Sequence, residues 1–188
     1  MIPKMASEYH LLMDAMETRI LDAALEAVAA GAATMDDIAQ GAGVGRVTLF
    51  RRFGSKDALL QRLCAREVER FLAQVDAALS EFDDPADRIA EAFVACVREG
   101  ARHPLLATVP RGVVFEALAA GPLDAGRQFV ADRLEPAEEA QADLLVRLAL
   151  TYVLIPGPLA DEQAARAFAR AYLAPIATAS ATSAPRAG

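Results

Sequence analysis

Apolar residues recur along most of this chain at intervals of three and four, the spacing of helices that bury one face. The first such stretch predicts a helix over residues 13–30, with acidic residues off its apolar stripe and Gly31 at its end. The stripe comprises Met13, Met16, Ile20, Ala24 and Val28.

Two short helical stretches follow, and glycines separate them. Thr34 is a typical N-cap for a helix over residues 35–42. A Gly-Val-Gly sequence at 43–45 breaks the pattern before a helix over residues 46–53, which is expected to bury Leu49 and Phe53. Two short helices joined by a tight glycine turn predict a helix-turn-helix unit whose second helix projects outward as a rigid rod.

The rest of the chain predicts longer helices. Ser55 is expected to cap a helix over residues 56–82, and residues 86–102 predict the next one. Pro136, followed by two glutamates in the first turn, marks the start of another helix, which ends at Pro-Gly-Pro 156–158. A last helix carries the apolar stripe Ala164, Phe168, Tyr172 and Leu173.

These elements make an all-α chain of about nine helices. We expect a helix-turn-helix DNA-binding domain over residues 1–55 and, joined to it by the long helix, a helical ligand-binding and dimerisation domain over residues 56–176. Residues 177–188 are small and polar enough to form a disordered tail. Residues 105–134 are punctuated by proline and glycine, and their pattern is less regular.

The composition agrees with a mostly helical protein. Of its 188 residues, 54% are hydrophobic; alanine raises this fraction, whereas β-branched and aromatic residues are sparse. The N-terminal residues lack the apolar core of a signal peptide, and no run of 18 uncharged residues occurs. We therefore expect a cytoplasmic protein with no membrane span.

Charge is distributed unevenly along the chain. The formal net charge is -7, yet residues 43–62 hold five cations and one acid. Residues 63–188 hold 12 arginines and 18 acids. A local basic segment on an acidic body favours contact with phosphates at one end of the molecule, without general affinity for polyanions.

Motifs of catalysis and metal binding are missing from the sequence. Cys64 and Cys96 show no metal or redox spacing, and each falls in a helical pattern where cysteine acts as a small hydrophobe. Of the two histidines, His10 lies near the N-terminus and His103, next to Pro104, is expected to cap a helix end. We predict no metal, no cofactor and no enzyme activity.

Residues 20–60 resemble the N-terminal domain of TetR-type (tetracycline-repressor-like) transcriptional regulators. Apolar, glycine and cationic positions agree with that family in register over about a fifth of the chain. The matching residues are Ile20, Ala23-Ala24, Val28, Gly31, Thr34, Ile38-Ala39, Ala42-Gly43-Val44, Thr48-Leu49-Phe50, Phe53, Lys56 and Leu59-Leu60.

The resemblance implies a homodimer that places its third helix in the major groove of a palindromic operator. It also implies a C-terminal pocket whose small-molecule ligand releases the double-stranded DNA. Carried over by position, Thr34 and Lys56 would contact phosphate and Thr48 backbone or base. Phe50 stands where the family usually has a tyrosine that binds phosphate, and Arg52 stands where histidine or another polar residue is frequent. The missing hydroxyl removes one phosphate contact, and the added charge of Arg52 is expected to compensate for this loss.

The residues themselves support a division of roles along the recognition helix. Arg46 and Val47 lie at its start, the end that faces base edges, where arginine can bind guanine and valine can pack on a thymine methyl. Arg51 and Arg52 lie later and are expected to meet the DNA backbone. The alternative for each cation, above all for Arg46, is an ordinary solvated surface position.

The ligand pocket and the dimer interface are predicted from apolar positions. The expected pocket residues are Phe93, Cys96, Val97, Leu106, Val114, Phe115, Leu118 and Phe129, which favour a small apolar or amphipathic ligand. The expected dimer residues are Leu144, Leu148, Tyr152, Phe168 and Tyr172. Plain core packing within one monomer is the alternative for both sets.

Two other functions stay open at this point. One is a helix-turn-helix DNA-binding regulator that has no small-molecule ligand. The other is a helical ligand-binding enzyme, which the missing catalytic motifs disfavour. The identity of the ligand, the operator sequence and the choice between repression and activation are not encoded in any pattern seen here.

Overall fold

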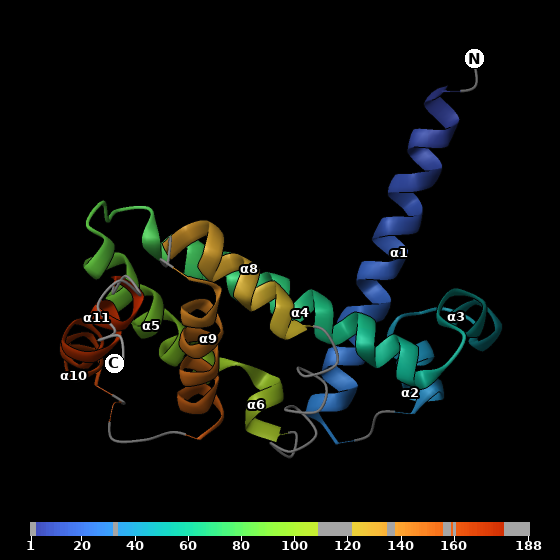
Figure 1. Cartoon of the computed structure of the whole chain (residues 1–188). Helices are drawn as coiled ribbons and strands as arrows, with labels where there is room; N and C mark the ends of the chain where they lie inside the picture. The colour runs from blue at the N-terminus through green and yellow to red at the C-terminus, as the bar shows by residue number, and fades with distance from the viewer. Residues whose placement is uncertain are drawn as a thin grey trace, which may run out of the picture.

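The computed structural model describes residues 3–31, 34–108, 122–134, 138–155, 159 and 161–178. The regular structure in these residues is helical, which confirms the predicted all-α class (Figure 1). None of the helices described combines the length and apolar character needed to cross a membrane.

The N-terminal unit consists of α1 (Pro3–Ala29), α2 (Met35–Gly41) and α3 (Arg46–Phe53). The bounds of α3 agree with the prediction, and α2 ends one residue earlier than expected. The predicted start of α1 at residue 13 was wrong: the helix begins at Pro3, because proline suits the first helical turn and no helix breaker follows it. The N-terminal part of α1 extends away from the rest of the molecule (Figure 1).

Local signals in the sequence determine the helix caps and the turn of this unit. The Thr34 hydroxyl accepts a hydrogen bond from the backbone N–H of Asp37 at 3.1 Å, as an N-cap should. Gly43 has φ 63, in the left-handed region that costs little for glycine, and so permits the tight turn between α2 and α3. Ser55 caps α4 (Lys56–Leu79) by accepting from the N–H of Ala58 at 3.1 Å.

One buried cluster joins the helix-turn-helix to the first turns of α4. Ile20 of α1, Ile38 of α2 and Leu49 of α3 are fully buried in it, together with Leu59 of α4. Leu63, one turn further along α4, is also buried there. The predicted domain boundary after residue 55 therefore coincides with a helix junction, while the hydrophobic core continues across it.

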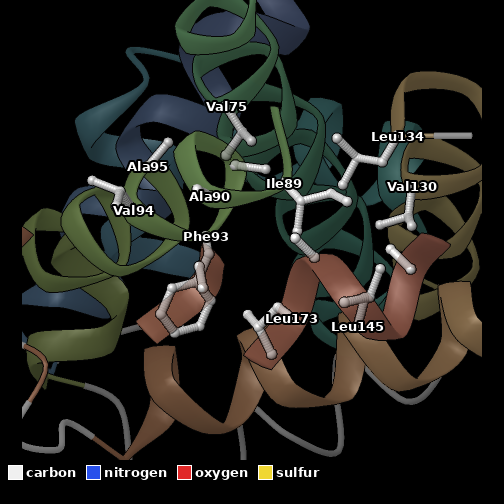
Figure 2. Close-up of a cluster of buried hydrophobic side chains, with 14 of the residues drawn as sticks. Val75, Ile89, Ala90, Phe93, Val94, Ala95, Val130, Leu134, Leu145 and Leu173 are labelled. Carbon is white, nitrogen blue, oxygen red and sulfur yellow. The ribbon is translucent and has the colours of Figure 1, made fainter. Parts of the chain in front are cut away.

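The C-terminal body contains α5 (Pro85–Arg102), α6 (Pro104–Thr108), α8 (Pro122–Leu134), α9 (Glu139–Leu154), α10 (Glu162–Phe168), a π-helical turn η1 (Ala169–Leu173) and α11 (Ala174–Thr178). Its core is formed by α4, α5, α8, α9 and the C-terminal helices (Figure 2). Ile89 and Phe93 of α5 lie in this core with Val75 of α4 and Leu145 of α9. Helix α4 thus contributes to both hydrophobic clusters and connects them.

Several predicted bounds in the body need correction. Helix α4 ends at Leu79 rather than at residue 82, and α9 begins at Glu139 with Glu138 as its N-cap. Pro136 and residues 156–158 lie outside the described residues. The irregular zone contains most of α6 and all of α8, and α11 extends to Thr178, so the expected tail does not begin at residue 177.

Gly100 of α5 provides a test of packing between α5 and α9. A Cβ atom built on Gly100 would lie 2.8 Å from Cγ1 of Val153. Gly100→Ala is expected to lower the free energy of unfolding by about 1–2 kcal/mol, because the overpacking exceeds the gain in helix propensity. Urea unfolding at a fixed protein concentration measures this change.

A second glycine serves as the control for this prediction. In Gly126→Ala the new Cβ would lie 3.3 Å from Cγ1 of Val146, a contact that small side-chain movements relieve. This variant is expected to be close to wild type. A Gly100→Ala protein as stable as Gly126→Ala would contradict the expected steric conflict.

Candidate nucleic-acid interface and ligand cavity

Helix α3 presents its polar side to solvent and buries one residue deeply. Leu49 is 0% exposed, whereas Val47 is 80% exposed and Phe50 is 38% exposed. Arg46 and Arg51 are exposed as well, and Thr48 is half-buried. An exposed valine next to exposed arginines is compatible with the predicted contacts to base edges and phosphates, which stay predictions.

Arg46, predicted to read a base, is held at the start of α3 by two contacts. Its guanidinium donates from one nitrogen, Nη1, to both carboxylate oxygens of Asp36 at 2.9 and 2.8 Å. It also lies over the Phe50 ring, 5.4 Å from the ring centroid. Since the side chains of Arg46 and Asp36 are 61% and 64% exposed, this pair contributes little stability, and a nucleic acid can replace it at small cost.

Arg52 differs from the other cations of α3, because it is paired with α1. It donates to Oε2 of Glu17 from Nε at 3.1 Å, and its Nη2 binds the same oxygen. Arg62 of α4 donates to Oε1 of Glu17 at 2.9 Å. Burial alone would raise the pKa of Glu17, but the hydrogen bonds from the two arginines lower it. Arg52 therefore joins α3 to α1 in the free protein, and its predicted phosphate contact stays a prediction.

The other predicted contact residues lie around the same surface. Arg51 and Lys56 are exposed and have no ion-pair partner among the side chains that the structure describes. Thr48 lines a shallow groove with Met16, Arg51 and Arg52. The Thr34 hydroxyl is bound to the Asp37 side chain as well as to its backbone N–H.

The C-terminal body contains a partly open cavity of about 180 Å³ among α4, α5, α6, α8 and α9. Of the predicted pocket residues, Phe93, Cys96, Leu106 and Phe129 line it. Val97 packs against the core but is not among the lining residues. Val114, Phe115 and Leu118 lie outside the described residues.

The sequence interpretation missed the contribution of α4 and α9 to the cavity wall. The residues it missed are Cys64, Glu67, Val68, Phe71, Leu72 and Val75 of α4, and Leu145, Val146, Ala149, Leu150 and Val153 of α9. The periodicity of α4 predicted a buried stripe, and that signal does not distinguish core packing from a cavity wall. His103 completes the polar part of the wall together with Glu67.

Both cysteines are free and both line the cavity. Burial raises the pKa of Cys64, and it raises the pKa of Cys96 to about 12. Neutral thiols at physiological pH add apolar surface to the cavity, in agreement with their expected role as small hydrophobes. No group of three His, Cys, Asp or Glu residues suited to a metal ion occurs among the residues described.

The predicted dimer residues lie on α9, α10 and η1. Leu144 is 42% exposed and Tyr172 is 62% exposed, and Ile155, next to α9, is 65% exposed. Tyr152 and Phe168 are half-buried against Phe93, with Tyr152–Phe93 ring centroids 5.2 Å apart in an edge-to-face arrangement. Leu144, Ile155 and Tyr172 leave apolar surface exposed here, and the dimer contact stays a prediction.

Comparison with known proteins identifies a family that matches the N-terminal part of this chain. The family described as bacterial regulatory proteins, tetR family, matches residues 20–63. An uncharacterised HTH-type transcriptional regulator of Mycobacterium tuberculosis is 30% identical over 171 residues, covering 82% of this chain and 80% of that protein.

Solved structures share the fold at lower sequence identity. The TetR family repressor AlkX from Dietzia sp. strain DQ12-45-1b, implicated in biodegradation of n-alkanes, superposes with a TM-score of 0.62 at 20% identity, covering 84% of this chain and 94% of that one. RolR in complex with the ligand resorcinol gives a TM-score of 0.62 at 17% identity, covering 89% and 90%.

Proposed function

Because this chain belongs to the tetR family of bacterial regulatory proteins and is a DNA-binding transcriptional regulator, we propose that it acts as a ligand-responsive homodimeric repressor. Family membership also sets it apart from enzymes, which disfavours the helical enzyme alternative. In this proposal, a small apolar or amphipathic molecule releases the dimer from a palindromic operator.

One observation carries the proposal: α4 begins in the DNA-binding surface and runs into the ligand cavity. Lys56 opens the helix beside α3, where helix N-terminal N–H groups favour phosphate. Further along the same helix, Phe71 and Val75 line the cavity. A ligand that changes the packing around Phe71 therefore acts on the same helix that begins beside the helix-turn-helix.

A homodimer would suit the geometry of operator recognition. A two-fold axis through the exposed stripe of Leu144, Ile155 and Tyr172 would duplicate α3. The two α3 helices must then meet half-sites about 34–36 Å apart, one turn of DNA. A small rotation of α4 would change the separation of the two α3 helices, so that one of them no longer meets its half-site.

The cavity supports the ligand-responsive reading over a regulator without a ligand. Its wall is mostly apolar, and its volume of about 180 Å³ exceeds the cavity of about 150 Å³ that is known to hold benzene. Heating the protein with a panel of lipophilic compounds checks this point, because a ligand that binds the folded state raises the unfolding temperature. If compounds relieve repression but none of them raises the unfolding temperature, the alternative of a regulator without a small-molecule ligand is favoured.

The DNA-binding surface is tested by measuring affinity for the protein's own upstream DNA over a range of salt concentrations. Arg51→Ala and Lys56→Ala are each expected to weaken binding to all sequences and to reduce the salt slope by about one unit, since each removes one phosphate contact. Arg46→Ala is expected to cost about 1–3 kcal/mol at one base position per half-site and to relax preference there.

A surface arginine of the body provides the matched control. Arg133 of α8 is 51% exposed and pairs with Asp76 of α4. Arg133→Ala is expected to leave both the salt slope and the base preference unchanged. If the wild-type protein binds neither its upstream DNA nor any selected duplex, the proposed function is overturned. If Arg46→Ala keeps the base preference of the wild type, Arg46 does not read a base.

A further inference from the structure

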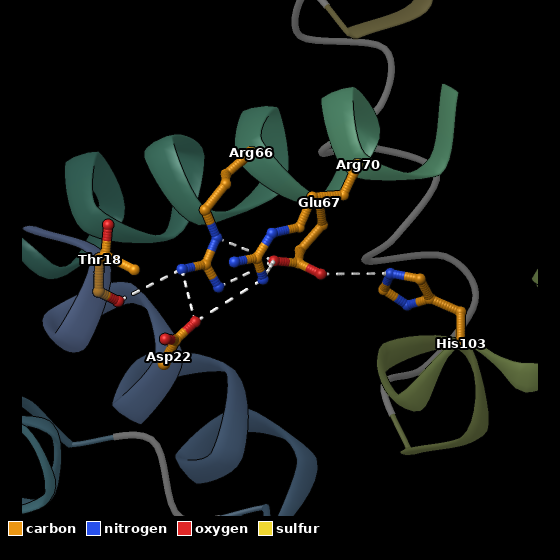
Figure 3. A network of polar contacts seen from close by, with 6 residues as sticks. All are labelled: Thr18, Asp22, Arg66, Glu67, Arg70 and His103. Atoms are coloured by element: carbon orange, nitrogen blue, oxygen red, sulfur yellow. Dashed lines mark hydrogen bonds and ion pairs between the residues drawn. The ribbon is translucent and has the colours of Figure 1, made fainter. Parts of the chain in front are cut away.

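His103, one of the residues that line the cavity, has a buried ring nitrogen that no described group uses. His103 follows α5 and lines the cavity with Glu67 of α4. Its Nε2 faces Oε2 of Glu67 across 3.5 Å (Figure 3). Its Nδ1 is buried and has no hydrogen-bond partner in the part of the chain that the structure describes. A buried polar atom without a partner costs stability, so a bound molecule that satisfies it would gain affinity.

The surroundings of His103 determine which kind of group can bind it. Burial lowers the pKa of His103, and the negative charge of Glu67 only partly opposes this effect, so the ring is neutral at pH 7. The Glu67 carboxylate only accepts, which assigns the ring proton to Nε2. Nδ1 is then an acceptor, and it requires a donor from the ligand.

Building on the proposed function, we infer that the cavity binds a neutral, largely apolar molecule with one hydroxyl or N–H group, which donates a hydrogen bond to Nδ1 of His103. A carboxylate does not fit this site, because the neutral ring offers it no proton at Nδ1. The volume of about 180 Å³ suits a molecule of about six to ten non-hydrogen atoms.

The same histidine is connected to the DNA-binding unit through a short chain of polar contacts. Arg66 donates from Nε to Oε1 of Glu67 at 2.9 Å. Arg66 also reaches α1, where Nη1 binds Oδ1 of Asp22 at 2.8 Å and the carbonyl oxygen of Thr18 at 3.3 Å (Figure 3). Glu67 is therefore shared between the cavity wall and the α1–α4 contact. A ligand that fixes the His103 ring changes the position of Glu67, and with it the packing of α1 on α4.

Two isomeric probes test the donor requirement. Heptan-1-ol and 1-methoxyhexane have the same atoms, but only the alcohol donates a hydrogen bond. Wild-type protein is expected to bind heptan-1-ol at least about fivefold more tightly, the lower end of what satisfying a buried acceptor contributes. His103→Leu is expected to lose this preference and to keep its affinity for the ether. Titration calorimetry measures both affinities.

A measurement on the wild type keeps the test independent of whether the variant folds. The chain has two histidines, so ¹⁵N-histidine labelling gives two sets of ring signals, and His10→Asn assigns them. Heptan-1-ol is expected to shift the Nδ1 signal of His103, and the ether is not. Equal affinities in the wild type, a preference that survives in His103→Leu, or no binding of either probe would each overturn the inference.

The connection to α1 is tested by the release of DNA. Saturating heptan-1-ol is expected to weaken binding to the upstream DNA by about 5–150-fold, the usual range of allosteric coupling. Asp22→Asn is expected to bring this factor close to one while heptan-1-ol still binds. Asp76→Asn, which breaks the separate pair with Arg133, is the control and should retain release. Full release in Asp22→Asn would overturn the connection.

Failure of this inference and failure of the proposed function have different signatures. Protein that binds its upstream DNA but shows no preference for the alcohol would retain the regulator function and lose the His103 site. Protein that prefers the alcohol through His103 but binds no duplex would retain the ligand site and lose the proposed function.

Discussion

Replacing Leu49 with alanine is expected to lower the free energy of unfolding by about 3–5 kcal/mol, the range for a leucine truncated in a close-packed core. The Leu49 side chain is 0% exposed and packs with the fully buried side chains Ile20, Ile38 and Leu59. It is also the one buried residue of α3, so its loss leaves the recognition helix with few contacts to hold it. Urea unfolding monitored by circular dichroism measures the change.

Val47 provides the control on the same helix. Its side chain is 80% exposed, so Val47→Ala is expected to change stability by less than about 0.5 kcal/mol. The two variants should separate folding from recognition: Leu49→Ala weakens DNA binding because α3 unfolds locally, whereas Val47→Ala alters base preference at full stability. Equal stability of the two variants would show that α3 does not depend on its buried leucine.

The helix-turn-helix was predictable because its determinants act over a few residues. Thr34, Gly43 and Ser55 specify two caps and a turn, and each does so in the structure. The spacing of Leu49 and Val47 likewise distinguished the buried from the exposed face of α3. Local chemistry of this kind needs no knowledge of distant segments.

The pairing of the cations was not predictable from local sequence. Arg52 binds Glu17, which lies on a different helix, and the exposed basic run in the sequence did not reveal that one of its members faces α1. Arg46 and Asp36 lie on consecutive helices, and their contact depends on the angle of the turn between α2 and α3. The basic segment therefore contains both exposed cations and a structural one.

The cavity also depends on contacts between segments distant in sequence. His103 was predicted as a helix-end residue, and it does cap α5. Its second role depends on Glu67 of α4, which lines the cavity next to it. No periodicity in either helix indicates that the two residues meet. The sequence thus predicted α4, α5, α9 and the last helical segment of the body, whereas α6, α8 and the polar end of the cavity required the structure.

A second large effect is expected from Glu91, which joins α5 to α10. Glu91 is a buried carboxylate of α5, bound by Arg166 through two nitrogens, one of them donating to Oε2 at 2.9 Å. Glu91→Gln is expected to lower the free energy of unfolding by about 2–4 kcal/mol, because it leaves the guanidinium without its counter-charge. The value lies below that for a fully buried pair, since the Arg166 side chain is 32% exposed.

The same pair makes stability depend on pH in a defined direction. Hydrogen bonding from Arg166 lowers the pKa of Glu91 below its ordinary value of 4.5, against the opposing effect of burial. A carboxylate with a lowered folded-state pKa binds fewer protons when folded, so its stabilisation is complete above about pH 5 and is lost as the pH falls through the folded pKa. The difference in stability between wild type and Glu91→Gln should therefore be constant near pH 7 and shrink on acidification. Unfolding measured from pH 7 to pH 3 checks this, with Asp76→Asn, at the solvent-accessible pair with Arg133, as the control. A difference that stays constant down to pH 3 would show that the loss in Glu91→Gln comes from packing rather than from the ion pair.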